Sequence, residues 1–184
     1  MNRSTHLGLI ARVLTALPLL LIALTASSLE AQTRVGIEIG SKPEPFALET
    51  VEGDLVDLAD VVGRRPVLLE FWASWCTECE ALHPTMEAAH EEFADRVEFY
   101  GVAVAVGQKP STIRKYLKKH PFSFPMLFDA RGDAVRQFMV PVTSYVVILD
   151  ADGRVAYTGV DSRQDISGAL RRIVGDGQSG TESS

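Results

Sequence analysis

Cysteine is scarce in this chain, which holds only Cys76 and Cys79 among 184 residues. A disulfide between them would close a very short loop, and loop closure stabilises little at that length, so a structural staple is disfavoured. An ordinary zinc site needs four ligands, and no further cysteine is present. The pair is left for redox chemistry or for a metal site that His83 would help to complete.

Basic residues are also in the minority, with 18 Lys and Arg against 24 Asp and Glu and a formal net charge of −6. Sequence-independent binding of nucleic acid depends on a basic face, so we exclude nucleic acid as a partner. The chain is 46% hydrophobic, which is enough to form the core of one domain.

The apolar stretch near the N-terminus is short. Arg3 and Arg12 precede or flank an apolar segment from Val13 to about Leu24, and small residues follow it. This order is typical of a secretory signal, whereas a membrane span needs about 20 apolar residues. We expect residues 1–31 to be a signal peptide or an N-terminal anchor. The domain would then be periplasmic or otherwise extracytoplasmic, and membrane-bound only if the segment is uncleaved.

Strand and helix patterns alternate along the rest of the chain, which favours an α/β three-layer sandwich over residues 32–174. The tail at 175–184 has no apolar residue and is predicted to be disordered. Strands are predicted at 65–73, 97–107, 124–129 and, as a pair, 144–160; helices are predicted at 76–96, 109–120 and 161–174, with a short helix or turn at 132–140.

Cys76 falls where a predicted strand has ended and a helix begins. Sites in open α/β sheets form at the carboxyl ends of strands. The N-terminus of a helix also stabilises a thiolate through unpaired N–H groups and the helix dipole. We predict that Cys76 attacks a partner disulfide and that Cys79, one turn deeper, resolves the mixed disulfide.

Glu70 interrupts the apolar strand before the cysteines, and alternation places it on the same face as Trp72. A buried carboxylate is costly unless it is paired or is protonated through a raised pKa. Two interpretations stay open. Glu70 forms a salt bridge with Arg64, Arg65 or a helix lysine, or it lies beneath the helix start and exchanges a proton with Cys79.

The motif FWASWCxxC followed by LHP, with Pro84 five residues after Cys79, resembles the thioredoxin superfamily. The resemblance covers about residues 40–174. Glu70 occupies the place of a buried aspartate in thioredoxins, which implies a catalytic role beside the two cysteines.

Two additions resemble the TlpA/ResA/CcmG-like branch, the redoxin group. They are an N-terminal β-hairpin at 46–58 and an inserted helix-strand segment at 108–129. The resemblance implies an extracytoplasmic protein-disulfide reductase whose only redox group is the Cys76–Cys79 disulfide, with no other cofactor and no metal. Its expected partners are protein disulfides, as in cytochrome c maturation, and an upstream membrane or periplasmic electron donor.

One position departs from the family pattern. Without gaps, the alignment puts Ser144 where the family has a cis-proline, with Thr143 before it, and a shift of three residues would bring Pro141 there instead. A non-proline residue is expected to keep a trans bond. We predict substrate binding by Trp72, Trp75, Thr143 and Ser144, although either tryptophan could serve in packing.

Acidic residues near the pair suggest the direction of transfer. Glu78 lies between the cysteines and Glu80 follows them, and such neighbours oppose a strongly stabilised thiolate. A reducing couple is therefore predicted, although carboxylates in the first turn also suit the helix dipole. The alternative function is a thioredoxin-fold copper chaperone or binding module using Cys76, Cys79 and His83.

Overall fold

The structure is a computed structural model that describes residues 36–175. The expected signal peptide or anchor at 1–31 and all but the first residue of the predicted tail at 175–184 lie outside the described residues. Within the described part of the chain, no helix combines the length and apolar character needed to cross a membrane.

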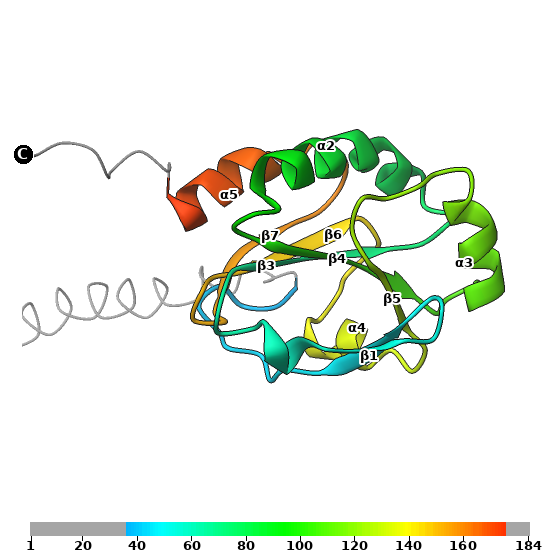
Figure 1. The fold of residues 1–184 in the computed structure, drawn as a ribbon, viewed down its shortest axis with the longest axis horizontal. Coiled ribbons are helices and arrows are strands. Elements are labelled where there is room, and N and C mark those ends of the chain that lie inside the picture. Colours follow the sequence, from blue (N-terminus) through cyan, green and yellow to red (C-terminus); the bar gives the residue numbers. More distant parts are fainter. Residues whose placement is uncertain (1–35, 176–184) are drawn as a thin grey trace, which may run out of the picture. The chain divides into compact units, whose positions relative to one another are not determined.

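A seven-stranded mixed sheet forms the centre of the domain, in the order β2-β1-β5-β4-β3-β6-β7 (Figure 1). Strand β3, an inner strand of the sheet, pairs in parallel with β4 and antiparallel with β6, and all of its residues are buried. The strands are β1 (Ala47–Thr50), β2 (Leu55–Asp57), β3 (Val67–Trp72), β4 (Glu98–Val104), β5 (Met126–Asp129), β6 (Tyr145–Leu149) and β7 (Val155–Gly159).

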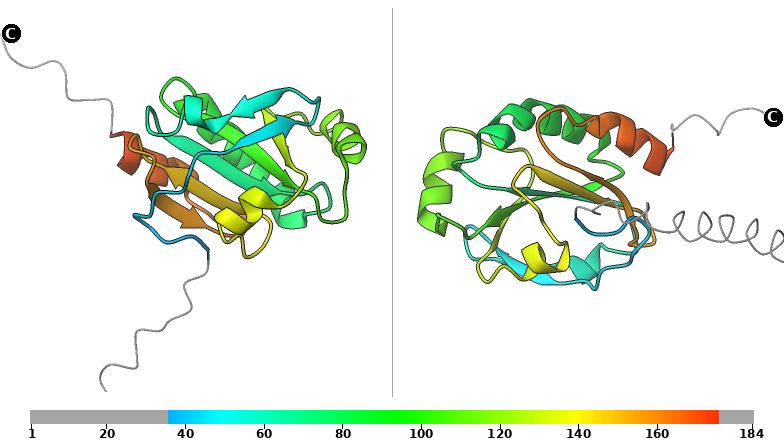
Figure 2. Two further views of the ribbon diagram at one scale, coloured as in Figure 1. Left: turned by 90° about the horizontal axis from the view of Figure 1, so that it is seen from below. Right: turned by 180° about the vertical axis from the view of Figure 1, so that it is seen from behind.

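Helices cover both faces of this sheet. Figures 1 and 2 show α2 and α5 together on one face and α4 on the other, and Figure 1 shows α3 on the side of β5. The predicted three-layer α/β sandwich is confirmed. The helices are α2 (Thr77–Phe93), α3 (Pro110–Leu117), α4 (Asp133–Gln137) and α5 (Ile166–Val174), with a short 3-10 helix η2 (Leu58–Asp60).

Both predicted additions are present. Strands β1 and β2 form an antiparallel hairpin in which Ala47 pairs with Asp57. Helix α3 and strand β5 fall within 108–129, and β5 lies between β1 and β4 in the sheet. The inserted segment therefore joins the hairpin to the central strands.

Helix α2 buries one side at helical spacing, through Leu82, Met86, Ala89 and Phe93. Pro84 lies inside this continuous helix, where it has no N–H to donate to the preceding turn. The apolar stripe holds α2 against the sheet.

Aromatic contacts show which way the residues of β3 point. The ring of Phe71 lies 5.5 Å from that of Phe138, directly after α4. The ring of Trp72 lies 5.7 Å from Tyr116 in α3 and 5.5 Å from Phe122, on the opposite face. Because side chains alternate along a strand, Glu70 shares the face of Trp72, away from α4.

Candidate active site

The turn that links β3 to α2 is held by the neighbouring loop. The backbone N–H of Ser74 donates to Oε1 of Gln108 (2.9 Å), and Nε1 of Trp75 donates to the carbonyl of Val106 (2.9 Å). The Gln108 amide also donates to the carbonyl of Val104 (2.7 Å), at the end of β4. These bonds fix the position from which α2 starts.

Cys76 and Cys79 form a disulfide at this turn, with their Cα atoms 5.3 Å apart. Cys76 is the N-cap of α2, and its Sγ accepts a hydrogen bond from the N–H of Cys79 (3.1 Å). The residues are 9% and 5% exposed, the order expected for attacker and resolver. The difference is small, so these two roles stay predictions.

Glu70 is fully buried in β3, six residues before Cys76. Neither carboxyl oxygen has a hydrogen-bond partner among the described residues. The salt bridge with Arg64, Arg65 or a helix lysine that the sequence left open is therefore absent from this part of the chain. Arg65 pairs instead with Glu98 (2.6 Å) and with the carbonyl of Asp95 (2.8 Å). The neighbours of Glu70 across the sheet are Gly101 and Val146, which have no polar side chain.

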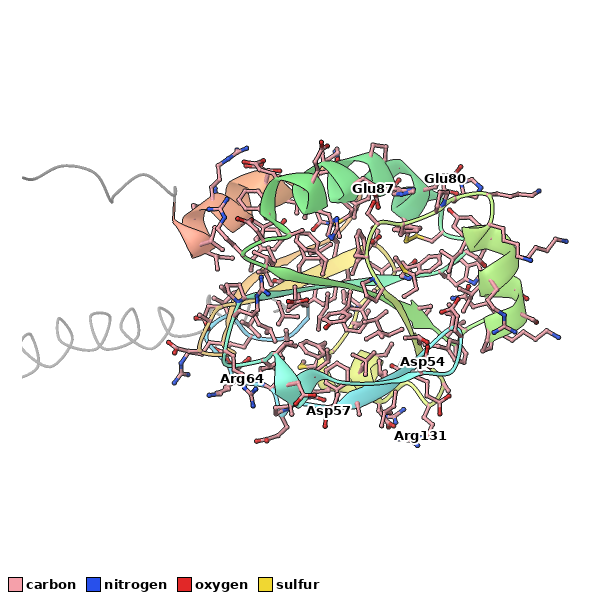
Figure 3. The ribbon with its side chains drawn as sticks, in the orientation of Figure 1. Asp54, Asp57, Arg64, Glu80, Glu87 and Arg131 are labelled. Carbon is pink, nitrogen blue, oxygen red and sulfur yellow. A yellow bond between two sulfur atoms is a disulfide. The ribbon has the colours of Figure 1, made fainter. Side chains whose placement is uncertain are left out.

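The environment of Glu70 keeps its carboxyl neutral over much of the physiological pH range. Burial raises its pKa from 4.5 to about 8, and the negative charge of Glu87 adds to the rise. Glu87 lies on α2, like Glu80 (Figure 3). Glu87 accepts hydrogen bonds from the N–H (3.1 Å) and hydroxyl (2.5 Å) of Ser123. Glu70 is therefore an acid whose ionisation falls near the pH at which thiols also ionise.

Ser144 takes a left-handed backbone conformation, with φ of 62°, and is 1% exposed. Its N–H donates to the carbonyl of Phe71 (2.9 Å), which extends the β3–β6 pairing toward the active-site turn. No peptide bond in the described part of the chain is cis, so the bond between Thr143 and Ser144 is trans, as expected. Pro141 is exposed and lies outside the strand.

The loop after β7 connects Ser144 to the cysteine helix, which the sequence did not reveal. The hydroxyl of Ser144 accepts from the N–H of Asp161 (3.1 Å), and its carbonyl accepts from the Gln164 amide (3.0 Å). Ser162, which follows Asp161 in the chain, donates through its N–H (3.1 Å) and its hydroxyl (2.6 Å) to the carboxylate of Glu78, which lies between the two cysteines. No sequence spacing signals contacts between positions so far apart in the chain.

The other predicted residues differ in their positions. Trp75, next to Cys76, is 53% exposed. Trp72 is 1% exposed and packs inside the domain, so it takes the packing role that the sequence left open as the alternative to substrate binding. Substrate contacts by Trp75 and Thr143 stay predictions. His83 stacks on Phe122, with ring centroids 4.0 Å apart.

No group of three or more His, Cys, Asp or Glu within 36–175 is arranged to hold a metal ion. The Nε2 of His83 lies 3.4 Å from a carboxylate oxygen of Glu87, on the same helix.

Comparison with known proteins identifies the family. Residues 39–158 match the AhpC/TSA family, a span of well over half of the chain. The chain belongs to this family. Thioredoxin-like protein YneN of Bacillus subtilis is 34% identical over 125 residues, covering 67% of this chain and 72% of that protein. Thiol-disulfide oxidoreductase ResA of Geobacillus thermodenitrificans is 27% identical, covering 86% of this chain and 93% of its own length.

Solved structures agree with this assignment. The thiol:disulfide interchange protein DsbE of Chlorobium tepidum has 29% identity and a TM-score of 0.65, covering 75% of this chain and 96% of that one. A secreted disulfide oxidoreductase of Mycobacterium tuberculosis has 26% identity and a TM-score of 0.61, covering 70% and 96%. With its Cys76–Cys79 disulfide at the strand end, this member of the AhpC/TSA family is a thiol-disulfide oxidoreductase of thioredoxin-like fold.

The raised pKa of Glu70 predicts a pH-dependent stability. Between about pH 4.5 and 8 the folded protein keeps this carboxyl protonated while the unfolded chain ionises it. The folded state then binds more protons, so the free energy of unfolding falls as the pH rises through this window. The slope is at most about 1.4 kcal/mol per pH unit.

Glu70→Gln should remove this slope. Denaturant titrations of the two oxidised proteins across the window measure the difference. The wild type should lose several kcal/mol relative to the variant on going from the acidic to the alkaline end. Parallel curves for the two proteins would contradict the assignment.

Replacing Ser144 with proline should destabilise the folded protein. Proline fixes φ near −65°, against 62° for Ser144, and has no N–H to donate to Phe71. Ser144→Pro is expected to lower the free energy of unfolding by about 3 kcal/mol or more. Ser144→Gly is the control and should stay within about 1 kcal/mol of wild type, because glycine adopts positive φ readily. Equal stability of the proline variant and wild type in thermal or denaturant unfolding would show that this backbone conformation is wrong.

Proposed function

We propose that this protein works outside the cytoplasm as a reductant of disulfides in partner proteins. The observation that carries the proposal is a disulfide-forming CxxC pair after β3, a strand that also holds a buried carboxyl with no polar partner in the described residues. The pair supplies two electrons, and the carboxyl supplies a site for one proton.

The cycle begins with reduced protein. The Cys76 thiolate attacks a partner disulfide, one partner sulfur leaves as a thiolate, and a mixed disulfide forms. The Cys79 thiolate then attacks Sγ of Cys76 and releases the second partner sulfur. Two electrons have passed to the partner, and the Cys76–Cys79 disulfide that remains is the state seen in the structure. An upstream dithiol returns the pair to the reduced form.

Glu70 acts on the second step. In ionised form it takes the proton of the Cys79 thiol, which makes that sulfur a nucleophile, and it is left as the neutral acid. The neutral acid is also the form that its surroundings favour once the disulfide has formed, because its pKa is about 8. Reduction of the pair returns the proton to Cys79.

Charges near the cysteines favour the reducing direction. Glu78 and Glu80 lie in the first turn of α2, and their carboxylates oppose the accumulation of a thiolate at Cys76. A strong oxidant instead depends on a highly stabilised thiolate in its reduced form. We infer a potential closer to that of thioredoxin than to that of a strong oxidant.

Two observations support work outside the cytoplasm. Residues 1–31 have the order of a secretory signal, and the Mycobacterium tuberculosis relative is described as secreted. Disulfides persist in such compartments, so substrates for a reductant are present there. The TlpA/ResA/CcmG-like resemblance implies substrates such as the haem-binding cysteines of apocytochrome c, copper-site proteins or other oxidoreductases.

Trapping tests the assigned roles of the cysteines. Cys79→Ser should accumulate a mixed disulfide through Cys76 when the reduced variant meets a protein disulfide, because no resolving thiol is left. Non-reducing electrophoresis and mass spectrometry of captured proteins from the native host measure this, with release by dithiothreitol. Cys76→Ser is the matched control and should trap little.

Two results would contradict the proposal. Trapping by Cys76→Ser alone would reverse the roles of the two cysteines. Stoichiometric Cu(I) binding that is lost in His83→Ala, in a protein with no disulfide reductase activity, would favour the metal chaperone instead.

A further inference from the structure

Lysine is distributed unevenly over this chain. Four of its five lysines, Lys109, Lys115, Lys118 and Lys119, lie in or beside α3. With Arg114 they place five cations between 109 and 119 and no acidic residue, while the rest of the chain holds all 24 Asp and Glu. All four lysines are exposed, and we call them the α3 lysine face.

Ion pairing does not account for this face. The ion pairs found among the described residues use arginine or histidine as the cation, and none uses one of these four lysines. Arg114 differs from them, because it donates to the backbone carbonyl of Val51 (2.5 Å). The lysine charges are therefore left for solvent or for a partner.

The stability of helix α3 does not explain all four lysines either. The helix dipole favours Lys115 and Lys118 near the C-terminal end of α3. It disfavours Lys109, which is the N-cap residue and makes no capping hydrogen bond through its side chain. A lysine at this position works against the helix, so its charge points to a role other than folding.

The α3 lysine face begins at Lys109, beside the active-site turn, and extends along α3 to Lys119. Lys109 directly follows Gln108, whose side chain binds the N–H of Ser74, two residues before Cys76. An eight-residue helix is about 12 Å long. A standard protein interface covers about 800 Å² on each partner, a patch roughly 30 Å across. A protein whose disulfide reaches Cys76 would cover Trp75 and then extend over α3.

We propose that the α3 lysine face docks an acidic surface of the protein that exchanges disulfides with Cys76. Attraction between opposite charges speeds encounter and orients the partner before the thiolate attacks. The proposal rests on the proposed function and names the chemistry of the partner. A net-acidic domain would otherwise repel acidic partners, and this face gives them one direction of approach.

Two synthetic peptides test the proposal. Each contains one intramolecular disulfide, flanked by four glutamates in one and by four glutamines in the other. Pre-reduced wild type should reduce the glutamate peptide about tenfold faster at about 10 mM ionic strength. The preference should disappear at about 1 M, where the Debye length is about 3 Å.

Matched variants locate the effect. Lys118→Glu with Lys119→Glu should abolish or reverse the preference and leave reduction of the glutamine peptide unchanged. Lys42→Glu with Arg64→Glu makes the same change in net charge and should keep the preference. Arg64 precedes β3 at the end opposite to Cys76 (Figure 3), and Lys42 follows Ser41, which pairs with the start of β7 at that end.

Serine versions of both peptides measure binding without exchange. Selective binding of the glutamate version by wild type, lost in the α3 variant, supports the lysine face even if no disulfide is reduced, a result that would contradict the proposed function alone. Equal preference in wild type and the α3 variant overturns the inference and leaves the function standing. If the α3 variant kept the peptide preference of wild type but lost binding to phosphatidylglycerol vesicles, the inference would also be overturned, and the lysine face would be assigned to a lipid surface.

Discussion

The burial of Glu70 without a polar partner among residues 36–175 is the constraint on which the chemistry of this domain depends. Its flanking strands present Gly101 and Val146 at the same level, and Arg65 is held by Glu98 instead. A charged carboxylate here is strongly disfavoured, so the core accommodates Glu70 as a neutral acid near neutral pH. Any reaction that gives it a proton is favoured, and resolution by Cys79 is such a reaction in the proposed cycle.

The backbone around the disulfide is fixed by contacts from three directions. Gln108 and Val106 hold the turn before Cys76, and Ser162 holds Glu78. Ser144 is held by the pairing with β3 and by the loop after β7. The proline that the thioredoxin resemblance leads one to expect at this position is absent, and these hydrogen bonds hold Ser144 instead. Trp75 stays exposed next to Cys76.

Local patterns were enough to predict the fold. The apolar run at 65–73 predicted a strand, and the structure has the fully buried β3 there. The spacing of the apolar residues from Leu82 to Phe93 predicted the side of α2 that is buried. Contacts between distant segments were not predictable, because no local pattern encodes them. The bonds from Ser162 to Glu78 and from Gln108 to Ser74 belong to this class. The sequence showed that Glu70 was anomalous, and only the three-dimensional surroundings of its carboxyl, which has no partner among the described residues, decided against a salt bridge.

The rate at which Cys79 resolves a mixed disulfide tests the account most directly. Release of thionitrobenzoate from its mixed disulfide with Cys76, followed by stopped-flow absorbance in wild type and Glu70→Gln, gives this rate across the pH range. The account predicts a wild-type rate that rises with pH up to about 8, as Glu70 ionises. It also predicts a slower variant whose rate follows only the ionisation of the thiol. Identical rates and pH profiles in the two proteins would contradict it.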